Sequence, residues 1–157
     1  MKPDQPQPIV VPPDSGKVLK FLGVTHKLTH QQTSGAYYLF EFEFDPESGN
    51  RLHVHSYEDE VAYVLEGAIE IRLDNQKIQA VTGGVAHLPK HIPHALYNPL
   101  KTSSRYLGMA IPGGIENFFD ELAIAQEAGT LDDAMHRIIS QKYGIEWLES
   151  TDHNDMP

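Results

Sequence analysis

Cysteine is absent from this chain of 157 residues. Without thiols, neither a disulfide framework nor a zinc–thiolate site is available, so nitrogen and oxygen atoms must bind any metal ion. The chain also lacks an apolar run long enough for a membrane span. Its first eight residues, rich in proline and glutamine, do not resemble a signal peptide, and we therefore expect a cytoplasmic location.

Basic residues are few. The chain has 12 Lys and Arg against 22 Asp and Glu, which gives a formal net charge of −10. Because no Lys/Arg cluster offers a groove for phosphate groups, neither nucleic acid nor an anionic membrane is expected as a partner. The acidity is most simply explained by solubility, and the length suits one well-packed domain.

The hydrophobic pattern predicts an all-β domain followed by helices. Short runs of alternating apolar and polar residues lie between turn sequences; in residues 35–44 one face carries Phe40, Phe42 and Phe44, which we expect in the core. Many short strands with regular turns are typical of a closed antiparallel β-barrel or a jelly roll. We expect an extended or disordered arm over residues 1–16, the barrel over 17–112, helices packed on it over 113–148, and a polar tail over 149–157.

Helical periodicity begins beyond residue 113. Residues 115–128 place four side chains near one face, Phe118, Phe119, Leu122 and Ala125. Thr130 is the expected N-cap of a second helix that reaches about residue 143 and is stopped by Gly144. Residues 145–148 are expected to pack back on the barrel.

The residues that indicate chemistry are His53, His55, Glu60 and His94. Residues two apart in a strand point to the same face, so His53 and His55 project together. Glu60 opens the next apolar run, and His94 comes from a third segment. These positions predict a site, assembled by several strands, that binds one divalent transition metal ion through imidazole and carboxylate groups.

The spacing of these residues resembles the two motifs of the cupin superfamily. The pattern HxH(x)4E(x)6G extends from His53 to Gly67, and the pattern G(x)5P(x)4H(x)3N extends from Gly83 to Asn98. The resemblance covers residues 37–143 and is to single-domain, quercetin-dioxygenase-like cupins. It implies the conserved cupin β-barrel (a double-stranded β-helix or jelly roll) with two C-terminal α-helices, and a homodimer.

Two glycines of the cupin motifs are replaced in this chain, one by Glu47 and one by His91. The replacements raise a question about turn geometry, because histidine in a positive-φ position is possible but strained. All four expected metal ligands are retained.

By resemblance, the leading expectation is a metal-dependent dioxygenase, an oxidoreductase acting on a small phenolic or enolic substrate that chelates the metal. Glu60 would be the catalytic residue, accepting a substrate hydroxyl proton, although a role as ligand alone is equally open. Fe or Mn suits O2 chemistry, and Ni, Cu or Zn suits the ligand set equally well. Two alternatives stay open: a metal-dependent isomerase or lyase, and a non-catalytic small-molecule-binding cupin.

Apolar residues beside the ligands are expected to line a substrate pocket. In regular strands Ala62 and Val64 share the face of Glu60, and Leu96 shares the face of His94, although one β-bulge would reverse this. Such a lining favours an aromatic or weakly polar ligand.

The remaining histidines are expected to have lesser roles. His87 and His91 fall between the ligand segments, with His91 expected at the rim of the site. Four others are expected at the surface, namely His26, His30, His136 and His153.

Overall fold

The computed structural model describes residues 8–73 and 76–149. Residues 1–7 of the predicted arm, two residues of a predicted hairpin loop, nearly all of the predicted tail and His153 lie outside these ranges. Residues 8–16 form neither helix nor strand. Within the described ranges, no helix combines the length and the apolar character needed to cross a bilayer.

Short strands are the main regular elements of the described chain. They are β1 (Lys17–Leu19), β2 (Val24–Leu28), β3 (Tyr38–Phe44), β4 (His53–His55), β5 (Asp59–Glu66), β6 (Ala68–Leu73), β7 (Gln76–Val81), β8 (Val85–Leu88), β9 (Ala95–Tyr97), β10 (Ser104–Ile111) and β11 (Ile145–Trp147). A 3-10 turn covers Lys20–Leu22, and the helices are α1 (Glu116–Glu127) and α2 (Asp133–Lys142).

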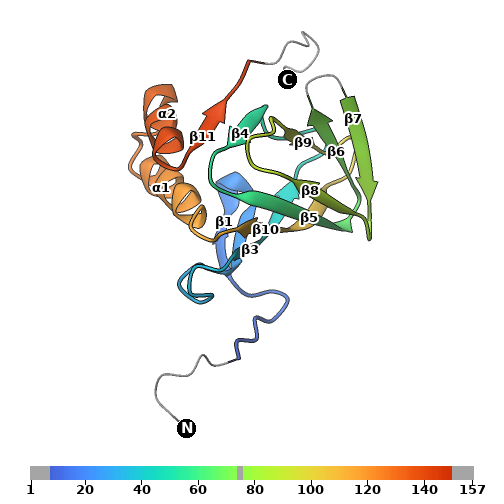
Figure 1. Cartoon of the computed structure of the whole chain (residues 1–157), viewed down its shortest axis with the longest axis horizontal. Coiled ribbons are helices and arrows are strands. Elements are labelled where there is room, and N and C mark those ends of the chain that lie inside the picture. Colours follow the sequence, from blue (N-terminus) through green and yellow to red (C-terminus); the bar gives the residue numbers. More distant parts are fainter. Residues whose placement is uncertain (1–7, 74–75, 150–157) are drawn as a thin grey trace.

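The strands pair antiparallel in three sheets (Figure 1), with the orders β1-β2-β3-β10-β5-β8, β7-β6-β9 and β11-β4. Among the described residues the hydrogen-bonded ladders therefore form separate sheets, not one closed ring. Inner-face residues of the two larger sheets belong to a single core cluster. Of the two predicted forms, this arrangement is the jelly roll, and the all-β prediction is confirmed.

Aromatic residues fill the space between the sheets. Phe40 and Phe44 are buried on β3, as the alternating pattern predicts. Phe42 stacks on Tyr106 of the neighbouring strand β10, with ring centroids 5.6 Å apart. Each large apolar side chain contributes roughly 1.5–3 kcal/mol when fully buried, so this group stabilises the scaffold that carries the site.

The two residues that replace motif glycines, Glu47 and His91, both have a left-handed backbone conformation. Glu47 has φ 52° and His91 has φ 66°. Both turns therefore keep the positive-φ conformation although glycine, the residue that adopts it most easily, is absent. The amide of His91 donates to the carbonyl of His55 over 2.8 Å, which gives this turn a direct connection to the strand of the HxH pair.

Asn98, the last residue of the second motif, is a structural residue. It is fully buried. Its amide donates to the carbonyls of Asp45 and Thr102 over 2.9 and 2.8 Å. Its Oδ1 accepts from the Ser104 hydroxyl over 2.8 Å. These bonds close the loop between β9 and β10 and hold it against the end of β3.

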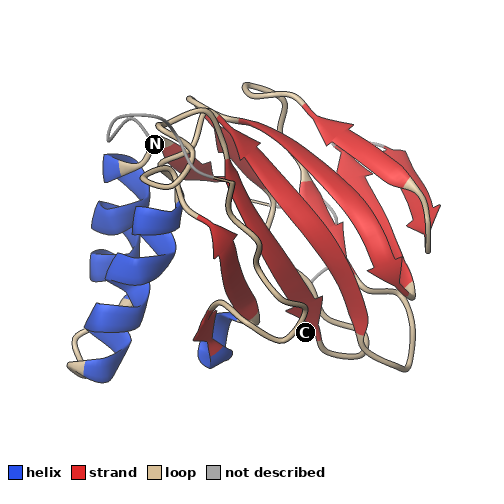
Figure 2. Ribbon diagram, turned by 90° about the horizontal axis from the view of Figure 1, so that it is seen from below, coloured by secondary structure: helices blue, strands red, loops and turns tan. Residues whose placement is uncertain are grey.

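The two helices pack against each other at one side of the sheets (Figures 1 and 2). The predicted buried face of α1 is confirmed for Phe118, Leu122 and Ala125. The predicted N-cap of α2 is wrong. Asp132 caps the helix by accepting from the Met135 amide over 2.8 Å, whereas the Thr130 hydroxyl donates back to the carbonyl of Ala125 in α1.

Candidate metal centre

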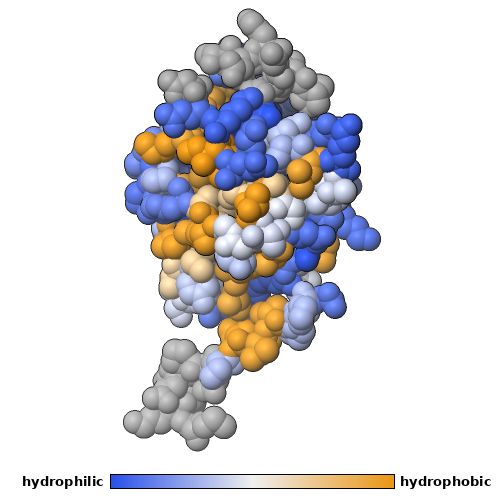
Figure 3. Space-filling model, turned by 90° about the vertical axis from the view of Figure 1, so that its right-hand side faces the viewer, coloured by the Kyte–Doolittle hydropathy of each residue, from blue (hydrophilic) through white to orange (hydrophobic). Residues whose placement is uncertain are grey.

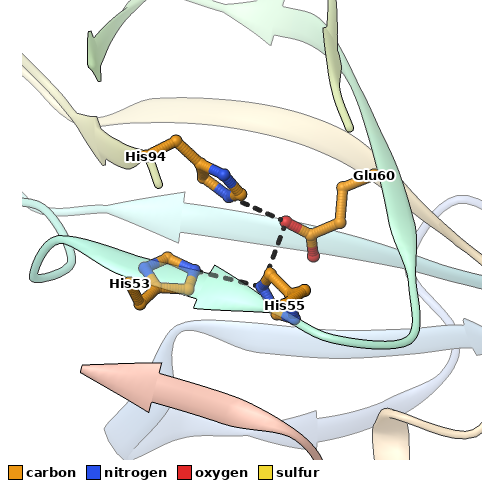
Figure 4. Close-up of side chains that lie close together, drawn as sticks. All are labelled: His53, His55, Glu60 and His94. Carbon is orange, nitrogen blue, oxygen red and sulfur yellow. Dashed lines mark hydrogen bonds and ion pairs between the residues drawn. The ribbon is translucent and has the colours of Figure 1, made fainter. Parts of the chain in front are cut away.

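Three histidines and a glutamate converge at one end of the sheets (Figure 4). His53 and His55 project from β4, Glu60 from the start of β5, and His94 from the residue before β9. One ligand atom from each of the four lies within 4.8 Å of all the others. The sequence predicted this set, and the structure brings all of it together. We call these four residues the metal cluster.

Backbone pairing explains how His94 reaches the HxH strand. The amide of His53 donates to the carbonyl of His94 over 3.0 Å, and the amide of His94 donates to the carbonyl of His53 over 2.9 Å. This isolated antiparallel bridge places the two side chains on the same side of the backbone. On β4 itself, His53 and His55 are buried and Val54 between them is less so, as expected for alternation.

The spacing of the ligand atoms suits a shared ion. His53 Nε2 lies 3.1 Å from His55 Nε2. Glu60 Oε2 lies 3.5 Å from His55 Nε2 and 3.4 Å from His94 Nε2. Two atoms that are each about 2.1 Å from a metal ion lie roughly 3.0–3.4 Å apart at octahedral or tetrahedral angles. The cluster therefore fits an ion without rearrangement of its backbone.

The buried polar atoms of the cluster are poorly satisfied by the protein alone. His94 is 1% exposed, and its Nε2 has no hydrogen-bond partner within the described ranges. An unpaired buried polar group costs about 1–3 kcal/mol. A cation bound between the rings would use this lone pair together with those of His53 and His55, so the donor set fits a divalent transition metal.

Electrostatics favour the metal-binding forms of His53 and Glu60. At His55, by contrast, burial is outweighed by the Glu60 and Glu58 carboxylates, which raise the pKa of the ring. Burial, together with the neighbouring His55 and His94, lowers the pKa of His53, which stays neutral. Burial alone would raise the pKa of Glu60, but the adjacent imidazoles, His55 foremost, lower it, so its carboxylate is ionised. Neutral imidazole and ionised carboxylate are the forms that bind metal ions.

Two residues near the cluster were missed by the sequence analysis. The ring of Trp147 lies against that of His53, with centroids 5.0 Å apart, because β11 pairs with β4. No local sequence pattern predicts this contact between distant segments. Glu58 is buried, with Oε2 3.6 Å from His55 Nδ1. Its position three residues after His55 was a usable signal.

The predicted pocket residues Ala62, Val64 and Leu96 are all buried members of the core cluster. The register shift between β5 and β10 falls next to Arg105 and Tyr106, beyond Val64, so β5 stays regular from Glu60 to Val64. Ala62 and Val64 therefore keep the face of Glu60. Their role in lining a substrate pocket stays a prediction.

The other histidines separate into exposed and buried ones. His87 and His91 are exposed and lie outside the metal cluster. The expectation of a surface position for His26 is wrong, because this residue is 4% exposed. His30 and His136 are half-buried. The error for His26 arose because its partners come from β3 and from α1, far along the chain.

His26 and His30 belong to a second group, the paired cluster, which also contains Tyr38, Glu116 and Asp120. His26 Nδ1 lies 2.6 Å from the Tyr38 hydroxyl, and its Nε2 lies 3.2 Å from Asp120 Oδ1, an ion-pair distance without hydrogen-bond alignment. His30 Nδ1 lies 2.6 Å from Glu116 Oε1. Glu116 also accepts from the amides of His30 and Gly114.

Comparison with known proteins agrees with this geometry. Residues 40–109, which include the whole metal cluster, match the cupin domain family. No curated protein matches the chain. Among solved structures, a proposed ethanolamine utilization protein Q from Salmonella typhimurium LT2 is 26% identical, with a TM-score of 0.50, over 58% of this chain and 69% of that one.

Two further structures share the fold. A predicted oxalate decarboxylase from Thermotoga maritima is 22% identical, with a TM-score of 0.53, over 57% of this chain and 78% of that one. KdgF from Halomonas sp. is 21% identical, with a TM-score of 0.53, over 66% of this chain and 90% of that one.

Proposed function

Since the chain contains a cupin domain in which three histidines and a glutamate converge, we propose that it binds one divalent transition metal ion and acts as a dioxygenase. The substrate would be a small phenolic or enolic compound that chelates the metal. The convergence of four ligand atoms within 4.8 Å, with His94 Nε2 unpartnered in the described structure, is the observation that carries metal binding.

An open metal site would account for catalysis better than a closed one. His53, His55, Glu60 and His94 supply four donors, so an ion that accepts five or six ligands keeps room for exogenous ones. Bound there, Fe or Mn would supply Lewis acidity and a centre for chemistry with O2.

Glu60 is the residue proposed for proton transfer. Its side chain is 14% exposed, more than that of any histidine in the cluster. Its lowered pKa keeps the carboxylate ionised, which is the form that can accept a proton, although the lowering also makes it a weaker base. The apolar side chains of Ala62, Val64 and Leu96 would complement an aromatic substrate beside it.

Metal analysis is the first test. Protein purified without a metal-affinity tag should contain near-stoichiometric transition metal by elemental mass spectrometry. His53→Ala and His94→Ala should lose it while keeping the circular dichroism of the fold. His87→Ala is the matched control, since His87 is exposed and outside the cluster. If the unaltered protein neither contains metal nor accepts Fe, Mn, Co, Ni, Cu or Zn, the proposal fails.

Oxygen consumption tests the reaction class. Metal-loaded protein with chelating phenols and diketones should consume O2 in proportion to product, and Glu60→Gln should lower turnover while retaining bound metal. Turnover that proceeds without O2 would instead assign a metal-dependent isomerase or lyase. A ligand that stabilises the protein and is recovered unchanged would assign a non-catalytic binding role.

The homodimer and the cytoplasmic location stay predictions. Apolar patches lie among polar residues on the face seen in Figure 3, and exposed apolar side chains of β7 and β8 include Ile78, Val81 and Val85. These strands are sheet edges, where a second copy would find apolar surface and unpaired backbone groups. Analytical ultracentrifugation measures the oligomeric state directly.

A further inference from the structure

The three histidines of the metal cluster are oriented in two different ways. His53 Nδ1 lies 2.7 Å from the carbonyl oxygen of Arg51. His94 Nδ1 lies 3.0 Å from the carbonyl oxygen of Ile92. In both cases the acceptor is the carbonyl two residues earlier, so Nδ1 carries the proton and Nε2 presents its lone pair to the centre of the cluster.

His55 does not use the equivalent carbonyl. That carbonyl belongs to His53 and accepts the amide of His94 over 2.9 Å. His55 Nδ1 instead faces Glu58 Oε2 at 3.6 Å. Both atoms are buried and neither has a hydrogen-bond partner in the described part of the chain, so each is the nearest candidate partner of the other.

The chain on either side of Glu58 is held by hydrogen bonds. The amide of Ser56 donates to the carbonyl of Gly144 over 2.9 Å. On the other side, the amide of Lys90 donates to Asp59 Oδ1 over 2.9 Å. Glu58 itself is 6% exposed. A carboxylate that is buried in this way has given up its hydration, which is costly unless it gains a specific partner.

We infer that Glu58 is a positioning residue for the metal ligand His55. Its carboxylate accepts the Nδ1 proton of His55 when the ring seats on the metal, and this fixes the tautomer in which Nε2 faces the ion. A shift of less than about 1 Å brings the pair within hydrogen-bond distance. The inference rests on the proposed metal site and adds a second buried carboxylate to it.

The charge of this second carboxylate also matters. Glu58 and Glu60 together carry two negative charges when ionised, which balance a divalent cation in a site shielded from water. A carboxylate on the far side of a ligating histidine raises the basicity of the ring. Removing such a partner lowers metal affinity by about 10–100-fold.

Cobalt binding measured by competition with a chromophoric chelator is the first readout. The unaltered protein should bind one Co2+, Glu58→Leu should bind it about 10–100-fold more weakly, and Glu58→Gln, which keeps an acceptor oxygen, should recover part of the loss. Glu66→Gln, an exposed carboxylate on β5, is the matched control and should bind as the unaltered protein does. Equal affinity of Glu58→Leu and unaltered protein would overturn the inference and leave the metal site standing.

The tautomer of His55 is a second readout that needs no metal. Long-range 1H–15N spectra at about pH 8.5, where an ordinary histidine is neutral, distinguish protonation at Nδ1 from protonation at Nε2. In metal-free protein His53 Nε2, 3.1 Å from His55 Nε2, competes with Glu58 for the His55 proton, so the fraction protonated at Nδ1 should be smaller in Glu58→Leu than in the unaltered protein. An unchanged tautomer contradicts the inference even if no metal is bound, whereas absence of metal binding alone contradicts the proposed function.

Discussion

The metal cluster and the paired cluster use the same residue types in opposite ways. In the paired cluster each histidine has its own carboxylate, Glu116 for His30 and Asp120 for His26. In the metal cluster three histidines surround a single carboxylate, and Glu60 Oε2 is approached by both His55 and His94. One group therefore has one carboxylate for each histidine, and the other has three histidines around one carboxylate.

The carboxylate of Glu116 shows how the paired cluster is held together. Glu116 is 2% exposed and accepts three hydrogen bonds, one from the ring and two from backbone amides, and so fastens the start of α1 to the loop after β2. His94 Nε2 and His26 Nε2 both lack a hydrogen-bond partner within the described residues, so the two clusters differ in the ratio of carboxylates to histidines and not in this respect. Buried nitrogen atoms without hydrogen-bond partners raise the free energy of the folded protein, and a bound metal ion would remove this cost.

Metal addition should stabilise the protein through the metal cluster. At a free metal concentration of about 100 times Kd, the free energy of unfolding rises by about 2.7 kcal/mol. For a domain of this size, Tm should rise by roughly 5–10 °C. Thermal unfolding followed by circular dichroism, with and without Co2+, measures the shift.

His94→Ala and Tyr38→Phe give matched controls for that shift. His94→Ala removes a donor of the metal cluster and should abolish the rise in Tm. Tyr38→Phe removes the hydroxyl that contacts His26 in the paired cluster and should leave the rise intact. Loss of the metal shift in both variants would mean that the two clusters are not independent.

Removing a carboxylate of the paired cluster should destabilise the protein without changing metal binding. Glu116→Ala leaves three partly buried donors of His30 and Gly114 without their acceptor. We expect the free energy of unfolding to fall by about 2–4 kcal/mol, measured by urea denaturation. Glu127→Ala, at the exposed end of the same helix, should change it by less than about 0.5 kcal/mol.

His91 and His87 sharpen the comparison, because these histidines lie in neither cluster. His91→Gly should stabilise the protein by about 0.5–1 kcal/mol, since the position has φ 66° and glycine adopts it without strain. His87→Gly lies on β8 and should destabilise by a similar amount. Chemical denaturation of both variants measures the opposite signs, and equal signs would exclude strain as the cause.

The smallest expected effect concerns pH and His26. Burial lowers the pKa of His26, and this outweighs the nearby Asp120 carboxylate, which acts in the opposite direction. The folded state thus holds fewer protons on His26 than the unfolded state, so its contribution to stability is present above the ordinary pKa of about 6.5 and is lost on acidification. His26→Gln should therefore lose less stability between pH 7 and pH 5 than the unaltered protein, in urea titrations at both values. If His26→Gln loses as much stability as the unaltered protein or more, groups other than His26 cause the acid sensitivity.

The parts of this architecture that depend on local spacing were predictable. The alternation His53-Val-His55 fixes two ligands on one face, and two motifs in the right order predicted Glu60, His94 and the jelly roll. The strained turn at His91 was also visible, because the motif requires a glycine there. In each case the information lies within a few residues of sequence.

Features that depend on distant pairing were not predictable. His26 was assigned to the surface because nothing near it in sequence indicates Asp120 or Tyr38 as partners. The N-cap of α2 was misplaced by two residues because the Thr130 hydroxyl bonds back to α1 instead of capping the next helix. Such choices are decided by packing between elements, which no local pattern encodes.

The pairing of β11 with β4 has a consequence for how the protein is made and handled. Trp147 lies opposite His53, and Ile145 lies opposite His55. During translation the HxH strand leaves the ribosome long before this neighbour, so the nascent chain carries the proposed metal ligands His53 and His55 on an uncovered strand. A fusion joined shortly after residue 149 would begin close to that strand, and metal content should therefore be compared between proteins tagged at opposite ends.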